Sequence, residues 1–222
     1  MKKKSMIKMI IDILMLILML LEYSKLYTGQ LIHEVAGIVL FVLFLTHNLL
    51  NINFYKGLLK GKYNFSRIII TTVDLLFLFC MIITIALGIP ISEKVFKFIN
   101  LNGNVTTRIL HTILGYWNLI LLSIHLGLHF KMIFAKLRSK IKDNKKLEVL
   151  LYIIQLVVVV YGIKVMNDTK LVLYLTGKAS FAVPTNVVSS ILNNFSIILS
   201  IAIITYNLDK IFSIKKRGKK SE

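Results

Sequence analysis

The chain has 222 residues, 56% of them hydrophobic, and its mean hydropathy is +0.76. These values exclude an ordinary soluble domain and predict an all-α, polytopic membrane protein that forms one membrane domain over residues 1–222. The formal net charge of +18 would suggest nucleic-acid binding in a soluble protein, but the placement of the basic residues described below argues against such a partner.

Six stretches are long and apolar enough to cross a bilayer as helices. They cover residues 6–22, 32–52, 67–89, 109–133, 147–166 and 187–207. The basic amino-terminal stretch has no small-residue cleavage site, so we expect the first span to be retained rather than removed as a signal peptide. Serine and asparagine dilute the sixth stretch, which leaves open a bundle of five spans with one re-entrant or interfacial segment.

The charges of the connecting segments predict the orientation. With the amino terminus in the cytoplasm, 21 of the 28 Lys and Arg residues fall in cytoplasmic segments. The positive-inside rule then predicts a multi-pass protein of the cytoplasmic membrane with both termini cytoplasmic. In that position the basic residues contact anionic lipid headgroups, and nucleic acid is not an expected partner.

The second and fourth spans share one histidine pattern. Residues 33–47 and 111–125 each contain His, three residues, Gly, nine residues and His. Fourteen positions make nearly four helical turns, so the two histidines of each span share a face and lie about 21 Å apart along the axis. Both spans would cross in the same direction, which places His33 and His111 at the outer depth and His47 and His125 at the inner depth.

Matched histidines at two depths are suited to two haems with two axial imidazoles each. Such an iron has no open position and serves electron transfer better than catalysis. The chain has no C-x-x-C-H run, so the haems would be non-covalent b-type haems. Packing of the bundle through hydrogen-bonded histidines is the alternative for each residue taken singly.

Small and basic residues flank the outer pair of histidines. Gly37 and Gly115 follow His33 and His111 by one turn, and each would leave room for a porphyrin or allow close helix packing. Arg108, one turn before His111, is a candidate partner for the propionates of the outer haem, or an ordinary interfacial residue. At the inner rim the corresponding candidates are Lys56, Arg67 and Lys131.

The inner ligand of the fourth span is ambiguous. His129 follows His125 by four residues and lies on the same helix face, so either residue could oppose His47. The repeated spacing favours His125. A zinc site at His125 and His129 is a further option, but the sequence indicates no third ligand.

Two aspartates, Asp12 and Asp74, lie within predicted spans, where a charge is costly. Each is expected to face the bundle near its cytoplasmic end. Structural pairing with Lys8 and Arg67 is one interpretation, and the protonatable group of a quinol site is another.

The runs LIHEVAGIVLFVLFLTHNLLNINFYKGL and RILHTILGYWNLILLSIHLGLHF resemble the flavinylation-associated cytochrome family of small bacterial cytochrome-b-like membrane domains. The resemblance covers residues 30 to about 134. It implies a di-haem core in 30–134 and electron export to extracytoplasmic flavin-carrying proteins. The implied haem ligands are His33, His47, His111 and His125, with His129 as the ambiguous fifth residue.

The sequence contains no nucleotide-binding glycine motif and no evident flavin-attachment segment, so any flavin would belong to a partner. The favoured function is a di-haem electron relay across the membrane, with quinone as a further candidate partner. Similar histidine pairs occur in ferric reductases and in cytochrome subunits of quinone-linked dehydrogenases, and this role stays open. A haem-free transporter of metal ions or protons is the third hypothesis.

Overall fold

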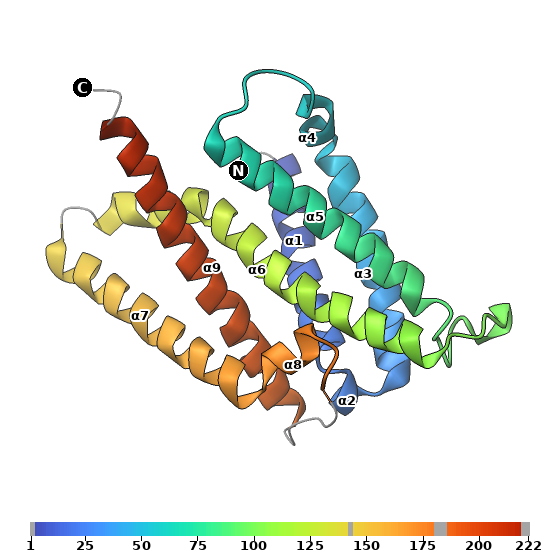
Figure 1. Ribbon diagram of the computed structural model, residues 1–222. Coiled ribbons are helices and arrows are strands. Elements are labelled where there is room, and N and C mark those ends of the chain that lie inside the picture. The colour runs from blue at the N-terminus through green and yellow to red at the C-terminus, as the bar shows by residue number, and fades with distance from the viewer. Residues whose placement is uncertain (1–2, 142–143, 180–185, 219–222) are drawn as a thin grey trace.

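The computed structural model describes residues 3–141, 144–179 and 186–218, and the side chains of residues 3–130, 144–179 and 186–212. The side chain of Lys131, named above, lies outside these ranges. Within them the chain is helical, with short connecting loops and no strand (Figure 1). The helices are α1 Lys3–Glu22, α2 Lys25–Thr28, α3 Gln30–Leu50, α4 Ile52–Gly57, α5 Phe65–Gly88, α6 Val105–Ile141, α7 Lys145–Asp168, α8 Leu171–Leu175 and α9 Val187–Gly218, with one 3₁₀ turn, η1 Lys97–Ile99.

Five helices are long and apolar enough to cross a membrane. They are α3, α5, the Val105–Phe130 part of α6, α7 and the Val187–Phe212 part of α9. The sixth predicted span corresponds to one of them, whereas the first does not, because α1 carries Lys8, Asp12 and Glu22 along its 20 residues. The structure therefore supports a helical membrane bundle with five candidate spans and a more highly charged α1.

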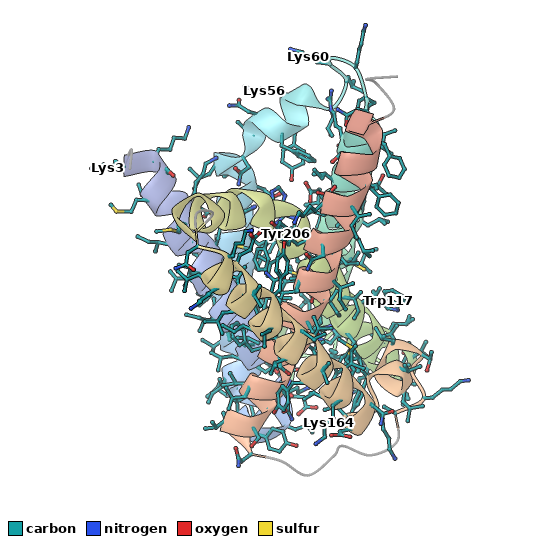
Figure 2. All side chains as sticks on the ribbon, turned by 90° about the vertical axis from the view of Figure 1, so that its left-hand side faces the viewer. Lys3, Lys56, Lys60, Trp117, Lys164 and Tyr206 are labelled. Atoms are coloured by element: carbon teal, nitrogen blue, oxygen red, sulfur yellow. The ribbon has the colours of Figure 1, made fainter. Side chains whose placement is uncertain are left out.

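The long helices associate in pairs. Helix α1 packs along α3, α5 packs along α6, and α6 and α7 both pack against α9. No packing of similar extent joins α3 to α5 or α6 in the described part of the chain. The start of α1 and the loop at Lys60 lie toward one end of the bundle, and Lys164 and Trp117 lie toward the other (Figure 2). The histidine helices α3 and α6 thus belong to two different helix pairs.

The serine residues that dilute the hydropathy of α9 are buried in helix contacts. Ser190 accepts a hydrogen bond from the Ser24 hydroxyl at 3.0 Å. Ser200 is fully buried, and it lies so close to Gly162 of α7 that no side chain would fit there. Small and hydroxylated residues allow helices in a membrane to approach closely. Helix α9 is therefore one continuous helix packed between α6 and α7 rather than a re-entrant segment, and the number of candidate spans is five, as in the alternative prediction.

One carboxylate attaches the loop after α5 to α3. Glu34, next to His33, accepts hydrogen bonds from the Ser92 hydroxyl at 2.7 Å and from the backbone N–H groups of residues 93–95 at 2.6–3.2 Å. The side-chain amide of Gln30 donates a further bond at 2.6 Å. Several donors around one charge make strong hydrogen bonds. This contact holds the Glu34 end of α3 in a defined position relative to α5.

We expect Glu34→Gln to destabilise the protein by about 1.5–3 kcal/mol, the range for hydrogen bonds to a charged group. Thermal unfolding in detergent measures the loss, and hydrogen exchange of the amides of residues 93–95 locates it. The matched control is Glu93→Gln, because Glu93 is about half exposed and its pair with Arg108 should contribute less than about 1 kcal/mol. Equal destabilisation by the two changes would contradict the role of Glu34.

Candidate functional site

Two of the predicted histidines face each other across the two helix pairs. The ring centroids of His33 in α3 and His111 in α6 are 6.1 Å apart, and the ring planes are nearly perpendicular at 85°. His33 Nδ1 lies 2.7 Å from Glu22 Oε2, and His111 Nδ1 lies 2.9 Å from the carbonyl oxygen of Thr84. Because Nδ1 of each ring lies close to an acceptor oxygen, Nε2 is the nitrogen that each could offer to a ligand.

Glu22 is enclosed at the end of α1. Its side chain is 15% exposed, and its Oε1 atom has no hydrogen-bond partner in the described structure. The contact of Oε2 with His33 Nδ1 is short, although the ring N–H direction is not that of a hydrogen bond. Rotation of the imidazole would direct the Nδ1–H group of His33 at Glu22 Oε2 and form a hydrogen bond. Glu22 is thus placed to accept the Nδ1 proton of His33. A Cβ atom on Gly37 would lie 3.7 Å from Glu22 Oε1, an ordinary contact.

The space around His111 differs on its two sides. A Cβ atom on Gly115 would meet no described atom within 4 Å, which is compatible with a flat ligand beside the ring. On the other side Gly88 of α5 is so close that its Cβ atom would lie 3.2 Å from His111 Cε1. Sequence reasoning missed Gly88, because it belongs to a different span and only the packing of α5 on α6 brings it here.

His47 and His125 each contact an aspartate. His47 Nδ1 lies 2.7 Å from Asp12 Oδ1, and His125 Nδ1 lies 2.8 Å from Asp74 Oδ1. His47 Nε2 also lies 3.3 Å from the side-chain amide nitrogen of Asn51. The structure records no ring contact between His47 and His125 among the described residues. The pair is therefore not brought together as His33 and His111 are.

These contacts correct the expected partners of the aspartates. Lys8 Nζ donates to Asn51 Oδ1 at 2.6 Å, and Arg67 Nη2 donates to a backbone carbonyl of α4 at 2.7 Å. Asp12 and Asp74 contact histidines instead. The physical reason is depth, because an imidazole on the facing helix is at the level of the carboxylate, whereas long basic side chains extend toward the interface.

The four partners of the histidines have a regular spacing of their own. Asp12 and Glu22 in α1 are ten residues apart, and so are Asp74 and Thr84 in α5. Helix α1 supplies both partners for α3, and α5 supplies both for α6. The region thus contains two similar helix pairs, which differ where one has Glu22 and the other the Thr84 carbonyl. The two equal spacings were a signal that sequence reasoning did not use.

Asp74 also completes a cluster with His125 and His129. One ligand atom from each lies within 4.8 Å of the others, the two rings are 4.6 Å apart, and His129 Nε2 is 3.9 Å from Asp74 Oδ1. The statement that His125 and His129 have no third ligand is therefore wrong. The third ligand comes from α5, whose packing on α6 the sequence did not reveal.

Arg108 has a carboxylate partner in this structure. Its Nη2 atom lies 3.0 Å from Glu93 Oε1, and both side chains are about half exposed. Arg108 also lines an open pocket of about 270 Å³ in the loop of residues 89–103, to which Lys97 and Asn102 contribute. A propionate at Arg108 would share the guanidinium with Glu93.

The described site therefore offers five imidazoles, three carboxylates and one carbonyl acceptor in two groups along α3 and α6. Imidazole and carboxylate are both groups that bind metal ions in proteins. Comparison of the chain with protein-family models, with curated proteins and with solved structures finds no match.

We expect Gly88→Val to weaken ligand binding at His111 about tenfold or more, because the added methyl groups displace the ring from the Thr84 carbonyl. Haem retained after purification is the measurement. Gly57→Val is the matched control, since a Cβ atom at Gly57 meets no described atom within 4 Å. Unchanged haem content in Gly88→Val would show that the position of the His111 ring does not matter.

Proposed function

We propose that this protein is a di-haem b-type cytochrome that relays electrons across a bacterial cytoplasmic membrane, with both termini in the cytoplasm. The observation that carries the proposal is the short separation of the His33 and His111 rings, each with an acceptor oxygen close to its Nδ1 atom. Two metal–imidazole bonds of about 2 Å, added to the half-widths of two rings, give a separation close to the observed 6.1 Å. The separation of the two rings thus supports a metal ion held by both imidazoles.

The neighbouring residues also suit an outer haem. Glu22 and the Thr84 carbonyl would hold the Nδ1 protons of His33 and His111, which sets the tautomer and orients each Nε2 toward the iron. The open space at Gly115 would accept part of the macrocycle. The bound haem would supply one-electron chemistry, and with both axial positions filled it would exclude oxygen and substrate.

For the inner haem, His47 and His125 are the proposed ligands, with Asp12 and Asp74 as acceptors of their Nδ1 protons. The two rings would have to face each other on haem binding, as the outer pair already does. His129 is the more exposed of the two candidates in α6, with 45% of its side chain accessible, against 24% for His125. This supports His125 as the ligand.

A different partner is proposed for each end of the bundle. An extracytoplasmic flavin-carrying protein would accept electrons at the predicted outer segments 90–108 and 167–186, of which residues 180–185 lie outside the described structure. A quinol or another donor would deliver them near Asp12 or Asp74 at the inner haem, and lipid headgroups would contact the basic segments. The same haem pair would suit the membrane subunit of a quinone-linked dehydrogenase or a ferric reductase. The identity of the partner protein would then distinguish these roles from the relay.

The purified protein is expected to contain two non-covalent haems per chain by pyridine haemochrome quantification. His33→Ala and His111→Ala should each remove one haem, because an iron loses an axial ligand, and His47→Ala should remove the other. The low-spin spectrum of the remaining haem should persist in each variant. A haem-free preparation from haem-replete cells would end the proposal.

A second candidate function has one specific observation in its favour. Asp74, His125 and His129 present carboxylate and imidazole ligand atoms of the type that binds zinc and other transition-metal ions, within 4.8 Å of one another. A site with three protein ligands leaves a position for exchange. The cluster thus supports the hypothesis of a haem-free transporter of metal ions or protons.

Replacing the two histidines of α6 separates these functions. For the cytochrome, His125→Ala should lose the inner haem and His129→Ala should keep both, since only His125 has the repeated spacing. For a transition-metal site, both variants should lose Co²⁺ binding, followed by its visible absorption, without any effect on haem. Loss of the inner haem in His129→Ala alone would place the ligand one helical turn further along α6.

A further inference from the structure

The loop between α5 and α6 has a fixed shape. It projects from the ends of the two helices (Figure 1). The backbone N–H of Gly103 donates a hydrogen bond to the carbonyl oxygen of Pro90 at 2.9 Å, which closes the loop on itself. A Cβ atom on Gly103 would lie 2.6 Å from that oxygen, so only glycine allows this approach. Glu34 also holds the N–H groups of residues 93–95. A ligand therefore meets a preformed surface, and binding costs little in ordering the loop.

The pocket in this loop is lined by cationic and amide side chains. Its volume is about 270 Å³, and Lys97, Asn100, Asn102 and Arg108 contribute to it. Ammonium, guanidinium and amide groups are all hydrogen-bond donors, and the planar guanidinium matches the geometry of a phosphate group. The volume is slightly below the roughly 300–1,000 Å³ of pockets that enclose a whole small molecule. The pocket therefore suits one anionic group of a larger ligand whose remainder lies outside.

The charges beside the pocket favour an anion with one negative charge. Lys97 and Arg108 provide two positive charges, and Glu93 Oε1 lies 3.0 Å from Arg108 Nη2. The Glu34 carboxylate is already bonded to the loop backbone and to the Ser92 hydroxyl, which offsets its charge. The Arg108 side chain is about half exposed, so its guanidinium can contact a second anion besides Glu93. The single negative charge of a phosphodiester would balance the remaining positive charge.

The loop lies at the edge of the candidate membrane spans. The span of α5 ends at Gly88, and the span of α6 begins at Val105. Phe98, Leu101 and Val105 are 81%, 53% and 72% exposed, and Leu101 also lines the pocket. Large apolar side chains exposed beside basic residues are typical of a surface that contacts lipid. Acyl chains on this surface would bring a lipid headgroup within reach of the pocket.

We propose that this pocket is a binding site for one phospholipid. Lys97 and Arg108 bind its phosphodiester group, and the exposed apolar residues of the loop contact its acyl chains. The site is distinct from the contact of the basic cytoplasmic segments with headgroups, because it lies at the other end of α5 from segment 56–67 and a loop of fixed shape forms it. The inference goes beyond the proposed electron relay and does not require haem.

The test is native mass spectrometry of the purified full-length protein in detergent, which measures the dissociation constant of the most tightly bound lipid. The probes are phosphatidylglycerol, diacylglycerol with the same acyl chains, and inorganic phosphate as a competitor. Phosphatidylglycerol should bind at least about tenfold more tightly than diacylglycerol, because two basic side chains bind its phosphate group. Inorganic phosphate at the same concentration as the lipid should not displace it, since it makes no apolar contact.

Three variants test the assignment of residues. Lys97→Gln should weaken the binding of phosphatidylglycerol about fivefold, the effect of one basic side chain near a headgroup. Lys94→Gln is the matched control, because it makes the same change of charge in the same loop at a residue outside the pocket lining, and it should leave binding unchanged. Glu93→Gln should strengthen binding, because Arg108 no longer shares its guanidinium with a carboxylate. All three side chains are exposed, so the variants should fold.

Three results would overturn the proposal. Equal weakening by Lys97→Gln and Lys94→Gln would show that only the net charge of the loop matters. Equal affinity for phosphatidylglycerol and diacylglycerol would show that the contact is apolar alone, and displacement by inorganic phosphate would show a site for soluble anions. Haem content is measured separately in the same preparations, so failure of this inference is distinguishable from failure of the proposed function.

Discussion

The interaction on which the described site depends is the contact between histidine Nδ1 and an acceptor on the partner helix. His33, His47, His111 and His125 all make such a contact, and none of the acceptors belongs to the helix of its histidine. Carboxylates and imidazoles are both costly in an apolar bundle when unpaired. At His47 and His125 the aspartate and the imidazole satisfy one another's polar groups. The contact thus orients the ring and gives a charged residue a place within a span.

This constraint explains why the helices associate in pairs. Helix α1 must lie in register with α3 to bring two acceptors to two histidines, and α5 must lie in register with α6 for the same reason. At the level of His33 and His111 the two pairs then face each other through their imidazoles rather than through closely packed backbones. Helices α7 and α9 complete the bundle on the far side of α6, with the small residues of α9 allowing close approach.

The two helix pairs carry different numbers of carboxylates beside their histidines. The pairs are alike in spacing but differ at Glu22 and the Thr84 carbonyl, so charge is distributed unequally along the bundle. The Glu34 contact stabilises the outer end, where the loop after α5 is held against α3.

Local periodicity by itself determined the positions of the apolar helices and the two matched histidine faces. These depend on residues within one helix, where the rise and the turn are set by the backbone. The register between helices depends on side-chain packing and loop length, which no single stretch contains. Tertiary structure alone therefore decided that Asp12 and Asp74 contact histidines, that Asp74 joins His125 and His129, and that Gly88 supports His111. It also decided the place of α9. The serines of α9 are polar and lower its hydropathy, but they are buried against other helices rather than exposed to lipid.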